Sequence, residues 1–300
     1  MFLIFYIFIF LFGLCIGSFL NCVIYRTELQ ENMPKGSPQR KVLSSLRGRS
    51  FCPKCKEQLR WQDLIPIFSF LFLRGKCRYC HKKVSIQYPL IELITGLLFL
   101  LIFDHSTERF ALVLGQNTQG LEHFGFLALS LGFLFYIVSS FIIIFVYDLK
   151  HYIIPDKVLF PAIIITFLYR LFENLKINSL IGNWKLKIEN FATISNFLLA
   201  ALIAAGFFFA IFLISNGKWI GFGDVKLAIL MGFFLGLPNV LAALFLAFFF
   251  GAIISIMLMV FGKKGLKSEI PFGPFLIAGT FIATLWGKEI IQWYFNLFNF

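Results

Sequence analysis

Apolar residues run in long uninterrupted blocks along this chain of 300 residues. Seven blocks approach or exceed the roughly 20 residues that an α-helix needs to cross a bilayer. They cover residues 1–25, 86–103, 124–147, 153–172, 191–214, 240–261 and 274–298, and a shorter eighth block covers 225–237. Strand-like alternation is absent, so the pattern predicts helices that satisfy their own backbone hydrogen bonds in lipid. The expected fold class is an all-α polytopic membrane protein of about eight transmembrane helices.

The pattern also divides the chain into three parts. The first block lacks a basic stretch before it and a small-residue cleavage site after it, so we expect residues 1–25 to be a retained anchor. Residues 26–85 form the one loop long enough to be a domain, and residues 86–300 are expected to form the main membrane domain. Within the loop, the apolar decamer 64–73 is too short to span. We expect it to lie against the membrane face or to form a small core over nearby cysteines.

Composition and charge refine this picture. With 59% hydrophobic and 14% charged residues, the chain is too apolar for a water-soluble fold. If the eight segments alternate in direction, 21 of the 27 Lys and Arg residues fall on the side that holds loop 26–85. The positive-inside rule makes that side cytoplasmic and places the amino terminus outside. Membrane orientation therefore explains the net charge of +12, and a nucleic-acid partner is not expected.

Four cysteines in loop 26–85 form two C-x2-C pairs separated by 21 residues. Two tight turns of this kind supply the four thiolates of a closed, tetrahedral structural zinc site. A disulfide framework is the alternative, but a cytoplasmic loop disfavours it. His81 adjoins the second pair and is interpreted as a bystander. The predicted zinc ligands are Cys52, Cys55, Cys77 and Cys80.

Two aspartates border apolar segments on the predicted cytoplasmic side. Asp148 directly follows the block 124–147. Asp224 lies in Gly221-Phe-Gly-Asp-Val-Lys226, directly before the short block 225–237. Their shared depth lets them meet, and two neighbouring carboxylates tend to share one proton, as general acid-base chemistry requires. Gly221 and Gly223 would allow the close backbone approach that an extended substrate needs. Solvated helix-end aspartates are the plainer alternative, and Asp156 rivals Asp148, although a helix N-cap is its ordinary role.

An ordered series of motifs between about residues 13 and 280 resembles the bacterial type IV prepilin peptidases, which are bifunctional leader peptidases and N-methyltransferases of type IV pilus and type II secretion systems. Besides the paired cysteines, the motifs are Gly17-Ser-Phe-Leu-Asn-Cys-Val-Ile-Tyr-Arg26, Asp63-Leu-Ile-Pro66, Leu73-Arg-Gly-Lys-Cys77, Tyr88-Pro-Leu-Ile-Glu92, Asp148-Leu-Lys-His-Tyr-Ile-Ile-Pro-Asp156, Gly221-Phe-Gly-Asp-Val-Lys226 and Ile270-Pro-Phe-Gly-Pro274.

The resemblance implies an aspartyl peptidase of the GxGD type in the inner membrane, with Asp148 and Asp224 as catalytic residues at the cytoplasmic face. Its substrates would be prepilins or pseudopilins, cut after a Gly between a basic leader and a hydrophobic helix. The new amino terminus would then be methylated with S-adenosylmethionine. No Gly-rich nucleotide loop follows a strand here, so the resemblance assigns methyl transfer to residues 26–100, with Glu92 as a candidate contributor; an ion-paired helix end is the alternative for Glu92.

Three other functions remain open at this stage. A transporter would also use intramembrane aspartates, but it predicts polar groups spread through several spans near the midplane. A presenilin-like or preflagellin peptidase would lack the paired cysteine loop and methyl transfer. A membrane-anchored zinc-ribbon adaptor would make both aspartates dispensable.

Overall fold

The computed structural model describes residues 2–33, 49–114, 121–181, 184–261 and 270–297. Residues 34–48 of the predicted cysteine domain lie outside this range. The elements are α1 (Phe2–Glu31), η1 (Trp61–Leu64), α3 (Phe68–Phe72), α4 (Gln87–Leu114), α5 (Leu121–His151), α6 (Asp156–Ile181), α7 (Trp184–Ile214), α8 (Phe222–Leu235), α9 (Asn239–Val260) and α10 (Gly273–Leu297). Across the described ranges there is no strand, only two isolated bridges.

The predicted fold class is confirmed: the chain is an all-helical, multi-pass membrane protein. Among the described residues, six helices are long and apolar enough to cross a membrane: α1, α4, α5, α7, α9 and α10. The other two predicted blocks correspond to α6 and α8. With 14 residues, α8 is only about 21 Å long at 1.5 Å per residue, which is less than the hydrocarbon thickness.

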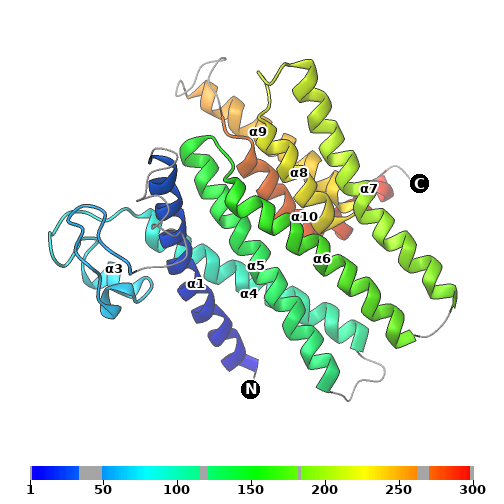
Figure 1. Ribbon diagram of the computed structural model, residues 1–300, viewed down its shortest axis with the longest axis horizontal. Helices are drawn as coiled ribbons and strands as arrows, with labels where there is room; N and C mark the ends of the chain where they lie inside the picture. The colour runs from blue at the N-terminus through cyan, green and yellow to red at the C-terminus, as the bar shows by residue number, and fades with distance from the viewer. Residues whose placement is uncertain (1, 34–48, 115–120, 182–183, 262–269, 298–300) are drawn as a thin grey trace. The chain divides into compact units, whose positions relative to one another are not determined.

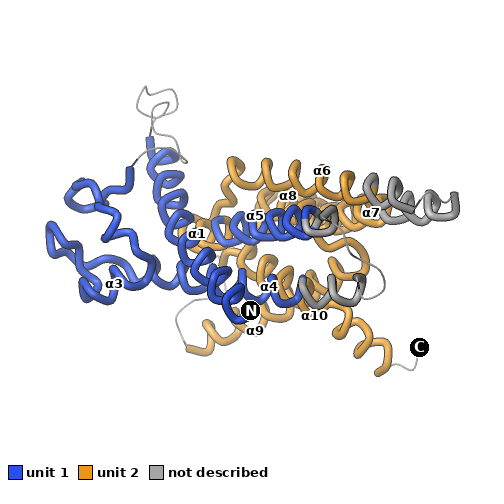
Figure 2. Tube along the Cα trace, turned by 90° about the horizontal axis from the view of Figure 1, so that it is seen from below, with its two compact units in different colours: residues 1–143 blue, residues 144–300 orange. Residues whose placement is uncertain are grey.

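The chain forms two compact units, residues 1–143 and 144–300, shown in blue and orange in Figure 2. In the first unit, α1 and α4 lie side by side and antiparallel (Figure 1). Gly13 and Gly17 of α1 form a G-x3-G pair, and a Cβ built on either would come within 2.7 Å of an α4 Cα atom. Small residues at such a crossing let two membrane helices approach closely. Asn21 extends the contact by donating to the carbonyl of Tyr88, at 3.0 Å.

The segment from residue 49 to residue 86 leaves α1 and returns to α4 through two similar turns. Each turn carries one cysteine pair and is closed by an antiparallel bridge, Phe51 with Gln58 and Lys76 with Lys83. Between the turns lie η1 and α3, so Phe68–Phe72 is the α-helical part of the predicted apolar decamer 64–73, and Leu64 is the last residue of η1. Gly75 allows the chain to reverse after α3, because its φ of +68° is in the left-handed region that favours glycine.

In the second unit, α8 is buried along most of its length and packs against α7 and α6, with further contacts to α9 and α10. Gly232 is required where α8 crosses α7, because a Cβ there would lie 2.3 Å from the Cα of Ala201.

Two polar residues from neighbouring helices hold the end of α8. Arg170 of α6 donates to the carbonyls of Phe233 and Phe234. Asn196 of α7 accepts from the Leu237 N–H at 2.6 Å. A cation and an amide that bind the terminal backbone groups stabilise a helix end. The short helix that carries Asp224 is therefore fixed at its far end.

Candidate functional site

Asp148 lies in the last turn of α5, next to the point where the chain turns into α6. Tyr152 ends the helix in a left-handed conformation with φ of 58°, and its N–H donates to the Asp148 carbonyl at 2.9 Å. The side chain of Asp148 is buried although the segment is close to a helix end. A buried carboxylate needs compensating donors.

The N-terminus of α10 supplies such a donor. The backbone N–H of Gly273, the first residue of α10, donates to the Asp148 carboxylate. A Cβ built on Gly273 would lie 2.5 Å from Asp148 Oδ2, so any other residue type would force this carboxylate to shift. The positive end of the α10 dipole also favours an anion there. Ile270-Pro-Phe-Gly-Pro274 thus contributes a glycine that seats Asp148.

Asp224 is the third residue of α8 and is partly buried. The extended Gly221 precedes the helix, and its N–H donates back to the Asp224 carboxylate. Both aspartates are therefore held by a backbone N–H at a helix N-terminus. Their carboxylates also interact electrostatically with each other, so the structure brings together the two residues that the sequence paired.

Ile154 lies between the segments that carry the two aspartates. A Cβ built on Gly223 would be 3.2 Å from Ile154 Cβ, and a Cβ on Gly273 would be 3.6 Å from Ile154 Cδ1. This buried side chain therefore contacts the residue before Asp224 and the residue that binds Asp148. Its volume sets how closely the two segments approach. The sequence patterns do not single out Ile154, because an isoleucine within an apolar motif carries no distinguishing signal.

Asp156 and Lys226 form a separate ion pair. Lys226 Nζ lies 2.8 Å from Asp156 Oδ1 and 3.0 Å from Oδ2, and it also lies over the rings of Phe160 and Phe222. The Asp156 side chain is 55% exposed. The pair joins the first turns of α6 and α8, and it gives Asp156 a partner other than substrate.

The four predicted cysteines come together in the first unit. All four Sγ atoms lie within 4.8 Å of one another. The two turns have the same hydrogen bonds: Cys52 N–H to Glu57 and Lys56 N–H to Cys52, then Cys77 N–H to Lys82 and His81 N–H to Cys77. Lys56 and His81 occupy matching left-handed positions, so His81 serves the turn and stands outside the four-sulfur group.

The thiols differ in how easily they ionise. Burial raises the pKa of Cys52, but donation from the backbone N–H groups of Cys55 and Lys54 outweighs burial and lowers it to about 7. At Cys55, donation from the Glu57 backbone lowers the pKa, whereas desolvation and the neighbouring thiols raise it to about 11. An ionised thiol thus opposes ionisation of the neighbouring thiols, and a divalent cation would relieve the repulsion between the thiolates. Sulfur-only ligands fit a soft metal ion.

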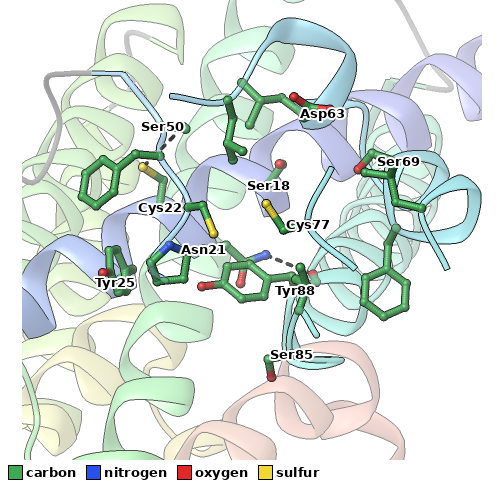
Figure 3. A pocket seen from close by; sticks show the side chains of 18 of the residues that line it. Ser18, Asn21, Cys22, Tyr25, Ser50, Asp63, Ser69, Cys77, Ser85 and Tyr88 are labelled. Atoms are coloured by element: carbon green, nitrogen blue, oxygen red, sulfur yellow. Dashed lines mark hydrogen bonds between the residues drawn. The ribbon is translucent and has the colours of Figure 1, made fainter. Parts of the chain in front are cut away.

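A cavity of about 480 Å³ opens beside this cluster, bounded by α1, the cysteine turns, α3 and the start of α4 (Figure 3). Cavities of about 300–1,000 Å³ are typical of small-molecule sites. One wall carries acceptors, Asp63 and Glu92, while Arg26, Lys76 and Lys82 add positive charge. Glu92 is buried and accepts from the Ile67 N–H at 2.8 Å.

The chain is similar to known proteins over nearly its whole length. Residues 11–106 match the bacterial peptidase A24 N-terminal domain, and residues 134–256 match the type IV leader peptidase family. The prepilin leader peptidase/N-methyltransferase of Aeromonas salmonicida (strain A449) is 30% identical over 301 residues, which cover 96% of this chain and 93% of the relative. The chain belongs to the type IV leader peptidase family.

Further relatives span the same length. The proteins of that name from Bacillus subtilis (strain 168) and Legionella pneumophila are 30% and 31% identical, each over 96% of this chain and over 97% and 94% of their own. No solved structure matches the chain. The two matched family regions contain the two candidate sites: the cysteines and Glu92 in the first, and Asp148, Asp156 and Asp224 in the second.

Asn21 is a further candidate in this family member, and the sequence patterns do not single it out. Its side chain is 4% exposed and lines the cavity, and its Oδ1 has no hydrogen-bond partner. A buried acceptor without a partner indicates a ligand or water. The available signal is a helical stripe in α1: the cavity is lined at positions i, i+3, i+4 and i+7 by Ser18, Asn21, Cys22 and Tyr25.

Proposed function

We propose that this chain is a membrane aspartyl endopeptidase that removes the basic leader peptides of prepilins or pseudopilins by cutting after a Gly. Asp148 and Asp224 are the proposed catalytic pair. The observation that carries the proposal is their convergence within one compact unit, where each is held by a backbone N–H and the charge of Asp148 acts on Asp224. Family membership supplies the class of substrate.

The two carboxylates would divide acid and base roles. Two carboxylates that interact electrostatically tend to share one proton, so the pair titrates as a unit. The ionised carboxylate takes a proton from water, and the water oxygen attacks the scissile carbonyl carbon. The protonated carboxyl donates to the carbonyl oxygen. When the C–N bond breaks, the leaving nitrogen takes the proton from the pair, and a hydroxyl of the tetrahedral intermediate gives its own proton to the other carboxylate as the product carboxyl forms. The pair then again holds one proton, as at the start.

The position of the pair fits a substrate that straddles the membrane boundary. We propose residence in the bacterial inner membrane with the active site on the cytoplasmic face, as the charge distribution of the loops requires. A basic leader then remains in the cytoplasm, while the following apolar helix is inserted. Its scissile bond lies at the depth of the α5 terminus and the α8 N-terminus.

The cysteine cluster is proposed to hold a structural zinc ion. Four thiolates in two matching turns leave no open coordination position for substrate or water. The metal would clamp the two turns together, and Cys52 and Cys77 also line the cavity. The zinc ion would thereby stabilise the wall of the cavity.

We further propose that the cavity binds S-adenosylmethionine and that the chain N-methylates the new amino terminus. When bound, this cofactor supplies an electrophilic methyl group on a sulfonium ion. The residues present fit it: Glu92 and Asn21 Oδ1, which has no partner among the described residues, are acceptors for cationic or N–H groups, and Lys76 and Lys82 can pair with a carboxylate. Tyr25 and Tyr88 offer aromatic surface to a purine.

Co-expression with a prepilin that bears a basic leader tests cleavage. We expect full processing by the wild-type chain and by Gly206→Ala, because a Cβ at Gly206 meets nothing within 4 Å. Asp148→Asn and Asp224→Asn should each leave the precursor intact while the proteins remain membrane-inserted and retain zinc. Complete processing by either variant would rule out the paired mechanism.

Mass spectrometry of the mature pilin amino terminus tests methylation separately. The wild-type product should carry one added methyl group, and variants of the cavity should release unmethylated product at a normal rate. A correctly cut, unmethylated product from the wild-type chain would remove the second activity and leave the first intact.

A further inference from the structure

None of the residues that the structure describes covers the apolar face of α3. Phe68, Leu71 and Phe72 are 52%, 64% and 84% exposed. Trp61 in η1 and Ile86, which directly precedes α4, are also strongly exposed. A cluster of large exposed apolar side chains in one short segment marks an interaction surface.

The opposite face of α3 belongs to the cavity. Ser69, which is labelled in Figure 3, lines it together with Phe70 and the C-cap residue Leu73. The ring of Phe70 is held inward against Gly75, since a Cβ built there would lie 3.1 Å from Phe70 Cζ. A helix of five residues thus forms a thin wall, with the cavity on one side and the exposed apolar face on the other.

The depth of α3 follows from its contact with α4. Ile67 N–H donates to Glu92 Oε2 at 2.8 Å. Glu92 is the sixth residue of α4, about 7.5 Å along the axis from Gln87, and helical side chains lean toward the N-terminus. Ile67 therefore lies level with the first two turns of a helix whose membrane-spanning stretch begins at Gln87.

The backbone at this contact is strained. Ile67 has φ of 61° and ψ of −50°, a γ-turn that β-branched residues rarely adopt. The Glu92 carboxylate holds its N–H at the turn, and Val84 N–H binds the Gly75 carbonyl at 2.8 Å beyond the far end of the helix. Both ends of α3 are therefore fixed in the position that leaves its apolar face outward.

We propose that α3 is an interfacial membrane helix, inserted into the headgroup boundary of the bilayer by Phe68, Leu71 and Phe72. Such helices typically bury their apolar face about 5–10 Å into the boundary, which matches the depth set by Glu92. The neighbouring Arg60 and Arg74 are exposed and suit the anionic headgroups of that boundary. The occupant of the surface is lipid rather than a second protein.

An embedded α3 would affect methylation, provided that the cavity carries out the proposed methyl transfer. If α3 is embedded, the wall of the cofactor cavity is part of the membrane boundary. The apolar amino terminus released by cleavage then reaches the cavity without leaving the bilayer. Removal of α3 from lipid should disturb methylation and leave cleavage unaffected, because Asp148 and Asp224 belong to the other unit.

Photocrosslinking in vesicles of mixed zwitterionic and anionic phospholipid tests the docking surface. A benzophenone amino acid is placed at Phe72, and as a control at Lys82, an exposed position in the second cysteine turn. We expect phospholipid adducts at position 72 and none at position 82. Adducts to a second copy of the chain, equal lipid labelling at both positions, or no lipid adduct at 72 would each overturn the proposal.

Methylation by matched variants tests the consequence. Phe72→Ser should reduce methylation about tenfold, since it removes most of an aromatic side chain that is proposed to be buried in lipid. Zinc content and cleavage should stay normal. Phe72→Leu keeps an apolar side chain and should restore methylation. Lipid adducts without methylation in the wild-type chain would refute the proposed transferase but leave α3 docking established. Full methylation by Phe72→Ser would show that the cavity does not depend on insertion.

Discussion

The Asp148 carboxylate occupies the space that a side chain at Gly273 would need. A Cβ there would lie 2.5 Å from Asp148 Oδ2, and the Gly273 N–H already donates to the same carboxylate. The glycine is therefore selected by close approach rather than by an unusual φ. The relationship links two motifs that are 125 residues apart in the sequence, and the motif around Gly273 contains no catalytic group of its own.

Gly273→Ala should abolish most cleavage. The added methyl group must displace Asp148, and a displacement of about 1 Å at a catalytic group costs on the order of a hundredfold in rate. The measurement is the initial rate of prepilin processing by purified enzyme in lipid. Methylation of a precut pilin should be unaffected.

Gly206→Ala is the matched control for that substitution, because it adds the same methyl group to a helix of the same unit without any neighbour within 4 Å. It should cleave at the wild-type rate. Normal cleavage by Gly273→Ala would show that Asp148 is not held as the structure places it.

A second substitution tests whether Ile154 sets the separation of the two aspartates. Gly223→Ala introduces a Cβ 3.2 Å from Ile154 Cβ and 3.3 Å from its Cδ1, and we expect about a tenfold loss of cleavage from this overpacking. Ile154→Ala removes Cγ1 and Cδ1 of the isoleucine, and with them two of its three close contacts with the new Cβ. The double variant should therefore cleave faster than Gly223→Ala alone, a non-additivity expected of residues in contact.

The pH profile of cleavage separates this spacing role from a general loss of stability. Altered spacing changes the coupling between two carboxylates and so changes the apparent pKa values of the pair. Ile154→Ala should shift the profile, whereas Ile153→Ala, at a 57% exposed neighbour, should not. Simple additivity together with an unchanged profile would contradict the role of Ile154.

Asp156 and Asp148 should respond differently to loss of charge. Asp156→Asn breaks an exposed ion pair with Lys226, and such pairs contribute about 0–1 kcal/mol. We expect cleavage within about fivefold of wild type, in contrast to the inactive Asp148→Asn. Loss of all processing in Asp156→Asn, with intact membrane insertion, would transfer the catalytic role to this residue.

The sequence predicts the fold class because membrane spanning is a property of composition. Unbroken apolar blocks must form helices in lipid, whatever their partners. The relation between α8 and its neighbours is harder to predict. Its C-terminal end is bound by Arg170 and Asn196, which come from distant segments of the chain. The sequence of α8 itself does not indicate these partners.

The candidate sites also differ in whether they follow from local spacing or from tertiary contacts. The cysteine cluster is predictable, because two residues between thiols fix their spacing locally. Asn21 is not, because its significance lies in an oxygen without a partner, which becomes visible only when α1 and α4 are packed together. Ile154 and Gly273 likewise acquire their roles through tertiary contacts. Local spacing is written in the sequence, whereas contacts across 50 or more residues require the folded chain.

The stability of the cysteine segment should depend on pH through Asp63. Burial opposes ionisation of this carboxyl, but hydrogen bonds from the Arg78 side chain and the Arg60 N–H outweigh it and lower its pKa. A lowered pKa in the folded state stabilises the segment above the unfolded value of about 3.9, and this contribution is lost as pH falls through the folded pKa.

Asp63→Asn removes the charged partner of Arg78, which should cost about 1–3 kcal/mol of folding free energy. The temperature at which zinc is released at pH 7 should therefore fall. The difference from wild type should begin to shrink as pH falls below about 4, where the unfolded carboxyl is protonated, and it should vanish below the lowered pKa of the folded carboxyl. A difference that stays constant down to the lowest pH would show that the charge of Asp63 has no role.

Asn21 provides the most direct test of the cofactor cavity. Asn21→Ala removes the unpartnered Oδ1 and the donor to the Tyr88 carbonyl together, and we expect about a tenfold loss of methylation with cleavage unchanged. Asn21→Asp keeps an acceptor at Oδ1 but lacks the donor, so it should retain more activity than Asn21→Ala if Oδ1 binds the cofactor. Equal losses in both variants would instead assign the effect to the contact with Tyr88. Calorimetric titration of each variant with S-adenosylmethionine measures the affinity directly, and Cys15→Ala, on an exposed part of the same helix, is the control that should bind as wild type does.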